Sequence, residues 1–268
     1  MQKFIGIIPA RYQSSRFPGK PLCDILGKPM IEHVYNSVKK WTYWKKVYVA
    51  TDNSKIFDIC EKLGIPVLIT GEKHIDCLDR AAEVVKILEK RNEGADKYII
   101  IQGDEPLFDV RTLDVDMEDN LINFYTEIQD EYDIYDNNAV KVVVSKHSKA
   151  IYFSRYTIPY HDKQTKRKDI DLKIYKQIGV YVFSGELLRK YSELESSYLE
   201  QMEGIGLNRF IENDIPISMR YTSYDSISVD TFDDRERIIS ILRKKYNKRG
   251  MIIDNNGKIT KKCENKTP

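Results

Sequence analysis

The feature that most constrains the fold is a regular alternation of short apolar segments and helical patterns between residues 4 and 102. The apolar segments predict strands at 4–9, 46–51, 66–70 and 98–102. The helical patterns, each with Pro, Ser or Asp near its start, occupy 29–40, 54–63 and 79–90. This order predicts an α/β fold with a mostly parallel sheet flanked by helices, in which ligands bind at the carboxyl ends of the strands.

The second half of the chain has a different pattern. It predicts strands at 139–145, 151–154 and 174–183, a helix from about Tyr198, and a last helix from Thr231 to Lys245. We therefore expect one Rossmann-like domain over residues 1–248, with a smaller lobe within about 138–222 that shapes the pocket for a second substrate or contributes to a dimer. The tail at 249–268, rich in Lys and Asn, is expected to be poorly ordered.

Composition excludes several classes of protein. A chain of 268 residues that is 41% hydrophobic can build a sizeable core and is not disordered. Its 43 basic and 41 acidic residues nearly balance, which argues against a nucleic-acid-binding face. The four cysteines are scattered without a CxxC pair, as in reduced thiols. No signal-peptide pattern and no apolar run of roughly 18 residues occurs, so a soluble cytoplasmic protein is expected.

The loop after the first strand carries three cations and hydroxyl groups, among them Arg11, Ser14, Arg16 and Lys20. Such a loop suits the phosphates of a nucleotide. It is not a Walker A loop, because Pro21 follows Gly-Lys, and no GxGxxG motif is present. Charged side chains on protein surfaces commonly contact only water, so a solvent-exposed basic loop without a ligand explains the three cations equally well.

Two carboxylates follow strand-like segments and are candidate metal ligands. Asp104 comes after the strand at 98–102, and Asp230 precedes Thr231, a predicted helix N-cap. At the carboxyl edge of a sheet, beside phosphates, such a pair would hold Mg²⁺. Asp230 could instead be a capping or loop residue, and Glu105 could be either a further ligand or an exposed turn residue.

A series of collinear motifs carries a family resemblance. They are PARYQSSRFPGKPL (9–22), GKPM (27–30), VATD (49–52), QGDEP (102–106), NAVKVV (138–143), YFSR (152–155), IP (158–159), GVY (179–181) and VDT (229–231). On these motifs, which span roughly residues 4–245, the chain resembles the 3-deoxy-manno-octulosonate cytidylyltransferases, or CMP-Kdo synthetases.

The resemblance implies a cytoplasmic homodimeric enzyme that transfers CMP from CTP to Kdo or a related 2-keto sugar acid and releases pyrophosphate with Mg²⁺. It places this reaction in the synthesis of bacterial surface polysaccharide, lipopolysaccharide or capsule. It also implies roles for residues of this chain. Arg11, Lys20 and Asp104 would be catalytic; the nucleotide would be bound by Arg11, Ser14, Arg16, Lys20, Arg80 and Gln102; and the metal would be held by Asp104 and Asp230.

The acceptor site implied by the resemblance comprises Gln102, Arg155, Gln177, Tyr181 and Arg209. Arg155 could either bind the acceptor carboxylate or form a structural ion pair. The chain departs from the family where Gln177 replaces a His and where the segment 206–209 replaces a Glu-Gln-Leu-Arg stretch. Another acidic acceptor, such as a different sugar acid, a phosphate ester or a phosphonate, therefore remains open.

A third departure lies near the position of the base, where 76–78 reads Asp-Cys-Leu in place of Ser-Gly-Thr. Two other functions also remain open at this point: a nucleotidyltransferase that uses another nucleotide, and a homologue without catalytic activity.

Overall fold

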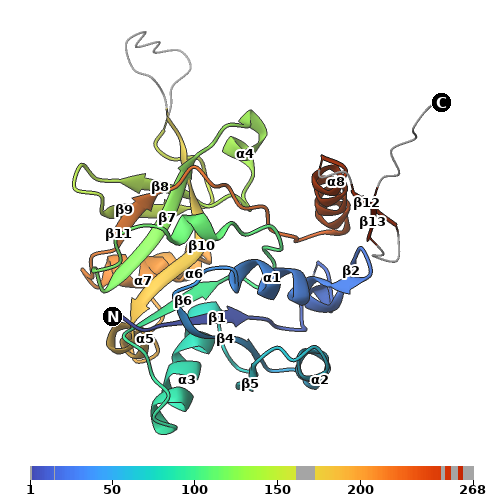
Figure 1. Ribbon diagram of the computed structural model, residues 1–268. Coiled ribbons are helices and arrows are strands. Elements are labelled where there is room, and N and C mark those ends of the chain that lie inside the picture. Colours follow the sequence, from blue (N-terminus) through green and yellow to red (C-terminus); the bar gives the residue numbers. More distant parts are fainter. Residues whose placement is uncertain (1, 15, 161–172, 249–250, 255–258, 262–268) are drawn as a thin grey trace, which may run out of the picture.

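The structure is a computed structural model that describes residues 2–14, 16–160, 173–248, 251–254 and 259–261. Within these residues one nine-stranded sheet forms the centre of the molecule (Figure 1). Its main path runs β11-β7-β10-β6-β1-β4-β5, with β8 and β9 attached to one side of β10. Among the described helices, none has the length and apolar composition needed to cross a membrane.

The first half of the sheet is parallel and confirms the predicted alternation. Its strands, β1 (Phe4–Pro9), β4 (Trp44–Thr51), β5 (Val67–Ile69) and β6 (Lys97–Ile101), pair side by side in the order β6-β1-β4-β5. The connecting helices are α1 (Met30–Val38), α2 (Ser54–Lys62) and α3 (Cys77–Lys90). The α/β fold class predicted from the sequence is therefore correct.

The central strands are buried on both faces, which explains their continuous apolar composition. In β1, Ile8 packs into a cluster with α1 and α2, whereas Ile5 and Ile7 pack into a second cluster with α3. All three side chains are inaccessible to solvent or nearly so. Helices thus cover the sheet on both sides, and polar side chains at the sheet reach solvent mainly at the strand ends.

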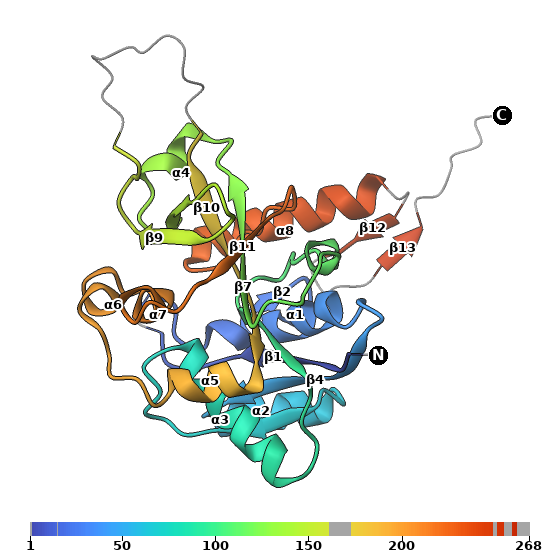
Figure 2. The same cartoon turned by 90° about the vertical axis from the view of Figure 1, so that its left-hand side faces the viewer.

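The second half of the chain extends the same sheet. Long strand β10 (Tyr175–Ser184) runs antiparallel between β6 and β7 (Leu121–Glu127), and β11 (Ser218–Tyr221) pairs parallel with β7. Neither β7 nor β11 was predicted. Two strands from the region of the expected lobe join the same sheet: β8 (Lys141–Val144) bonds to β10, and β9 (Ala150–Ser154) bonds to β8. Figure 2 shows β9, β10 and α4 (Glu131–Tyr135) at one end of the molecule.

Three short helices follow β10: α5 (Gly185–Tyr191), α6 (Tyr198–Glu203) and α7 (Leu207–Glu212). The predicted start of a helix at Tyr198 is confirmed. Leu188 of α5 and Phe210 of α7 join the cluster under α3. These helices therefore support the face of the sheet that carries α3.

The last helix, α8 (Phe232–Lys248), begins where it was predicted to begin. Thr231 caps it: its hydroxyl accepts a hydrogen bond from the backbone N–H of Asp234, and its own N–H donates to the Asp234 carboxylate.

The expectation of a poorly ordered tail is wrong for two short segments. β12 (Met251–Ile253) and β13 (Ile259–Lys261) form an antiparallel pair beside α8, and Ile253 packs against the core. Asp254, after β12, is exposed, and the remaining residues of the tail lie outside the described part of the chain.

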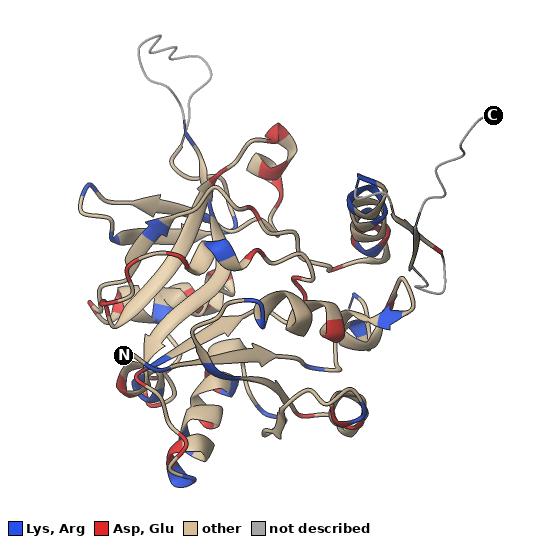
Figure 3. Ribbon diagram, in the orientation of Figure 1, with Lys and Arg blue, Asp and Glu red and all other residues tan. Residues whose placement is uncertain are grey.

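Charges of both signs are interspersed along the elements (Figure 3). This distribution agrees with the near balance of basic and acidic residues in the sequence. Any binding of anions must therefore depend on local groups of residues.

Candidate functional site

The loop after β1 and the turn after β6 meet at the carboxyl edge of the sheet. Lys20 begins a short 3-10 helix (Lys20–Leu22), and its Nζ lies 2.7 Å from Asp104 Oδ2 and 3.1 Å from Asp230 Oδ1. The structure thus brings together three residues that are far apart in the sequence. Burial alone would lower the pKa of Lys20, but the two carboxylates outweigh burial and raise the pKa, so the ammonium is charged.

A close backbone approach holds this edge together. Gly103 follows β6, and a Cβ at this position would overlap the carbonyl oxygen of Pro9 at the end of β1. Only glycine lets the two strand ends come this near. The spacing between the cationic loop and Asp104 therefore depends on Gly103.

Arg16 adds a second cation at the same place. One guanidinium nitrogen lies 3.2 Å from Asp230 Oδ1, and another donates to Asn138 at 2.8 Å. About half of the Arg16 side chain is exposed, which leaves it accessible to a ligand. Arg80 differs, because it is buried and its guanidinium donates to Asp52 at 2.9 Å.

A cavity of about 350 Å³ lies over the cationic loop. All the residues predicted to bind nucleotide or metal line it: Arg11, Ser14, Arg16, Lys20, Arg80, Gln102, Asp104 and Asp230. The segment from His74 to Cys77 and Gly204 also line it. The predicted nucleotide-binding set is therefore brought together in one cavity.

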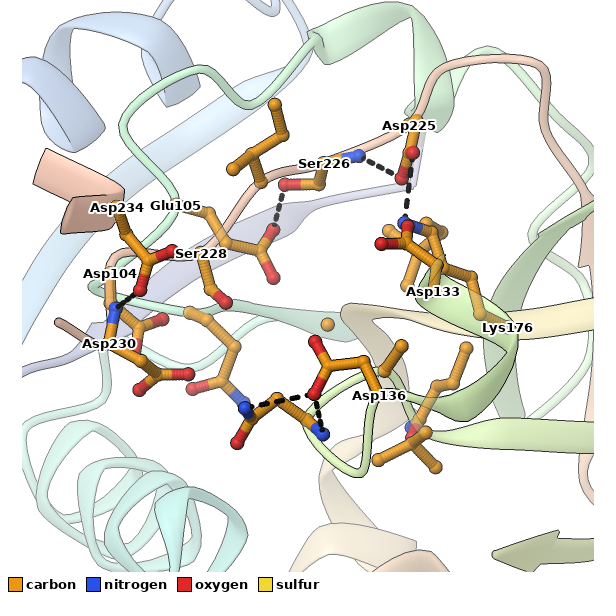
Figure 4. A pocket seen from close by; sticks show the side chains of 18 of the residues that line it. Asp104, Glu105, Asp133, Asp136, Lys176, Asp225, Ser226, Ser228, Asp230 and Asp234 are labelled. Atoms are coloured by element: carbon orange, nitrogen blue, oxygen red, sulfur yellow. Dashed lines mark hydrogen bonds and ion pairs between the residues drawn. The ribbon is translucent and has the colours of Figure 1, made fainter. Parts of the chain in front are cut away.

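A second cavity, of about 330 Å³, shares Gln102, Asp104 and Asp230 with the first (Figure 4). Of the predicted acceptor residues, Gln102 and Gln177 line it. The other charged groups on its wall come from the turn after β6, from α4 and the residue that follows it, from β10, from the segment before α8 and from α8 itself: Glu105, Asp133, Asp136, Lys176, Asp225, Asp234 and Arg237. A molecule in this cavity would meet a molecule in the first cavity at the two shared carboxylates.

Lys176 and Glu105 show how charge is arranged in the second cavity. Lys176 Nζ lies 3.1 Å from Asp133 and 2.9 Å from Asp225, so its charge is paired. Glu105 is buried, not an exposed turn residue, and accepts a hydrogen bond of 2.6 Å from the Ser226 hydroxyl. Burial raises the pKa of Glu105 to about 7.

Tyr181, a predicted acceptor residue, lies on β10 beside the predicted pair Gln102 and Gln177. The Gln177 amide donates to its hydroxyl at 3.4 Å. Burial raises the pKa of Tyr181 well above its usual value, so the hydroxyl stays protonated. Tyr181 therefore orients Gln177 at the wall of the second cavity.

Arg155 does not line either cavity, and the structural alternative fits it better. Its guanidinium donates to the backbone carbonyls of Asn137, Glu203 and Gly204. Its own N–H donates to the Glu203 carboxylate at 2.8 Å. Arg155 thus ties the segment around Gly204, at the rim of the first cavity, to β9.

The prediction that Arg209 binds the acceptor is corrected by its placement. Its side chain is 3% exposed and forms a two-pronged ion pair with Glu200, which is 6% exposed. Its guanidinium also stacks on the Tyr191 ring, 3.9 Å from the centroid. Burial alone would raise the pKa of Glu200, but the hydrogen bonds from Arg209 outweigh burial and lower it. Arg209, on α7, is a buried structural cation, because Glu200 of α6 and Tyr191 of α5 enclose its guanidinium.

Asp104 and Asp230 are suited to a divalent cation. An oxygen of each carboxylate points at the same ammonium group, so both can point at one ion. Among the described residues there is no cluster of three or more His, Cys, Asp or Glu that could hold a metal. A metal bound by this pair alone would need phosphate oxygens and water to complete its shell, which is how Mg²⁺ is commonly held beside nucleotides.

Several lining residues were missed by sequence reasoning. Asp133, Asp136, Lys176, Asp225 and Arg237 lie on loops and elements without a motif, and only the fold brings them to one cavity. Asp76 was noted as a departure from the family, yet no role was assigned to it. Asp76 lines the first cavity.

Comparison with known proteins identifies the family of the chain. Residues 5–221 match the profile of the cytidylyltransferase family. A 3-deoxy-manno-octulosonate cytidylyltransferase of Syntrophus aciditrophicus is 37% identical over 90% of this chain and 98% of its own length. One of Thermodesulfovibrio yellowstonii is 38% identical over 87% of this chain and 95% of its own.

Solved structures give the same result. The structure of CMP:2-keto-3-deoxy-manno-octonic acid synthetase complexed with CTP superposes with a TM-score of 0.80 and 32% identity, covering 91% of this chain and 99% of that one. A putative glucose-1-phosphate thymidylyltransferase from Bacillus anthracis shares the fold, with a TM-score of 0.64 at 16% identity over 90% of this chain and 95% of its own. The chain belongs to the 3-deoxy-manno-octulosonate cytidylyltransferase family.

Proposed function

We propose that this protein transfers CMP from CTP to 3-deoxy-manno-octulosonate, or a closely related 2-keto sugar acid, and releases pyrophosphate. The observation that carries the proposal is a pair of adjoining cavities that share Gln102, Asp104 and Asp230. One of the two is lined by the cations of the loop after β1. Two substrates that react with each other need such a shared boundary. The family membership supports the choice of CTP and of the sugar acid.

The triphosphate would lie on Arg11, Arg16 and Lys20, whose charges stabilise the negative charge that builds up on the phosphates during transfer. The acceptor hydroxyl would enter from the second cavity and attack the α-phosphorus opposite the leaving pyrophosphate. Mg²⁺, held by Asp104 and Asp230, would supply further charge neutralisation at the phosphates. When nucleotide and metal bind, the Lys20 ammonium would exchange a carboxylate partner for a phosphate oxygen.

We further propose that the protein acts as a cytoplasmic homodimer in the synthesis of bacterial surface polysaccharide. This setting comes from the family, since the acceptor is a sugar acid that is activated before it is transferred. Both substrates are small and highly charged, which favours a site open to water over one within a membrane.

The test is pyrophosphate release by the purified protein with CTP, Mg²⁺ and a panel of acceptors that contains 3-deoxy-manno-octulosonate, sialic-type acids, sugar phosphates and phosphonates. Release with the first compound supports the proposal. Release only with another acid would replace the proposed acceptor, and would assign the change to the wall around Gln177. No release with any acceptor or nucleotide would contradict the proposed activity.

A further inference from the structure

The first cavity, called the nucleotide cavity from here on, is lined by a carboxylate, that of Asp76, which is held in one orientation. Asp76 directly precedes α3 and caps it: one carboxylate oxygen accepts hydrogen bonds from the backbone N–H groups of Leu78 and Asp79, both at 2.9 Å. The other oxygen accepts a short hydrogen bond from the Tyr191 hydroxyl. Three donors from two elements therefore fix the side chain.

The surroundings of Asp76 are built to keep it there. A Cβ on Gly206 would overlap both the Asp76 carboxylate and the Tyr191 hydroxyl, so only glycine leaves room for this pair. The Tyr191 ring is held in turn by the stacked Arg209 guanidinium. The buried Arg209 thus acts through Tyr191 as a positioning residue for Asp76.

The position of Asp76 in the cavity indicates which part of a nucleotide it meets. The lining of the cavity includes both the cations Arg11, Arg16 and Lys20 and the carboxylate of Asp76. Arg16 and Lys20 contact Asp230, whereas Asp76 contacts Tyr191, so the two groups have different surroundings on the wall. A triphosphate is attracted to the cations and repelled by an unpaired carboxylate, which favours the nucleoside as the part of the nucleotide beside Asp76.

An ionised carboxylate only accepts hydrogen bonds. Cytosine presents an exocyclic amino group that donates, whereas uracil presents an oxygen that accepts at the same position. We propose that Asp76 accepts a hydrogen bond from the exocyclic amino group of cytosine and thereby selects CTP over UTP. This inference rests on the proposed function and names the residue that reads the base.

The selection would be strong for a physical reason. A site that offers a fixed acceptor rejects a ligand that brings another acceptor, because both groups lose water and neither gains a partner. The three donors that hold Asp76 prevent it from turning away from the mismatched base. Three of its four lone-pair positions are occupied, and the oxygen that accepts from Tyr191 keeps one position for a ligand.

The experiment compares kcat/KM for CTP and UTP in the wild type and in Asp76→Asn. Asparagine is a good N-cap, so α3 keeps its start, and its amide can donate to the uracil oxygen. We expect the preference for CTP over UTP to fall by about 10- to 100-fold, as for a lost hydrogen bond to a charged group. Asp79→Asn is the matched control: it removes the same charge from the same helical turn but does not line the cavity, so the preference should stay unchanged.

Two outcomes would overturn the inference. One is a folded Asp76→Asn variant with the wild-type CTP preference; the other is a variant whose KM rises only for the acceptor. If Asp76→Asn does not fold, Tyr191→Phe keeps the carboxylate and removes the donor that orients it, and a smaller loss of preference is expected. Calorimetric binding of CTP and UTP separates this inference from the proposed activity, because base preference in binding requires no turnover.

Discussion

Lys20 is the residue on which the two halves of the site depend. Its ammonium bridges Asp104 and Asp230 within a part-buried site, and it lines the nucleotide cavity. The Lys20 ammonium therefore holds the two carboxylates together in the structure. In the proposed reaction it would contact the phosphates of the bound nucleotide.

Lys20→Ala should lower kcat/KM for CTP by about 100- to 1,000-fold, because a fixed charge next to the reacting phosphates is lost. Lys28→Ala is the control. Lys28 lies on the same stretch of chain, but its side chain is half exposed and pairs with Glu32 outside the nucleotide cavity. The rate of pyrophosphate release measures the activity of both variants. Equal activity of the two variants would contradict the role given to Lys20.

Arg209 illustrates why a residue type does not determine a role. Arg209→Met should destabilise the protein by about 3–5 kcal/mol, because the buried Glu200 carboxylate loses its partner. Urea unfolding measures this free energy.

The double variant Arg209→Met with Glu200→Leu is the matched test of the same ion pair. It removes both charges and should recover most of the lost stability. If the double variant is as unstable as the single one, the loss comes from packing and not from the unpaired carboxylate.

At the scale of elements, the site depends on how closely β1 and β6 approach each other at their carboxyl ends. Their register pairs Ile7 with Ile100, and Gly103 then lies against Pro9. The cationic loop and Asp104 are the direct continuations of these two strands. Any separation of the strand ends therefore changes the distance between Lys20 and the carboxylate.

Gly103→Ala should destabilise the protein by about 1–3 kcal/mol and lower CTP turnover, since the new methyl group overlaps backbone that has little freedom to move. Gly71→Ala serves as the control, because the nearest atoms to a Cβ there are side-chain ends at 3.5 Å. Thermal unfolding and pyrophosphate release give the two readouts. A fully active Gly103→Ala variant would show that the strand ends tolerate separation.

At the scale of the whole molecule, the stability of the protein should depend on pH through His33. Burial lowers the pKa of His33, which lies on α1 and contacts the carbonyl oxygen of Ile25 at 2.7 Å; Asp24, Lys28 and Glu32 are its charged neighbours. Because its folded pKa lies below 6.5, the unfolded chain binds the proton more readily. The contribution of His33 to the free energy of unfolding should therefore decrease as the pH drops below about 6.5. Glu105, whose pKa is raised to about 7, contributes with the opposite sign, so the effect of His33 is read from the difference between variant and wild type.

His33→Gln should flatten this decrease, as measured by urea unfolding between about pH 5 and pH 8. His147→Gln removes a histidine that is exposed, so it should leave the wild-type profile unchanged. Parallel profiles of His33→Gln and the wild type would contradict the assignment to His33.

Much of the molecule could be predicted from local patterns. The β-α alternation up to residue 102, the cap of α8, and the cationic loop are contiguous in sequence, so their signals survive without tertiary information. The strands β7 and β11 could not be predicted in this way, because their pairing partners are distant in the chain. Arg155 and Arg209 were assigned to the acceptor because burial and pairing cannot be read from residue type.

The sequence by itself determined the fold class, the family, and the cationic loop that we propose contacts the nucleotide: these follow from periodicity and from motifs whose members are neighbours in the chain. Tertiary structure alone decided that Lys20 bridges two carboxylates, that Arg209 is a buried support, and that Asp76 lies in the nucleotide cavity. The physical reason is that these roles depend on distance and on burial. Both quantities are set when strands and helices that are remote in sequence pack together.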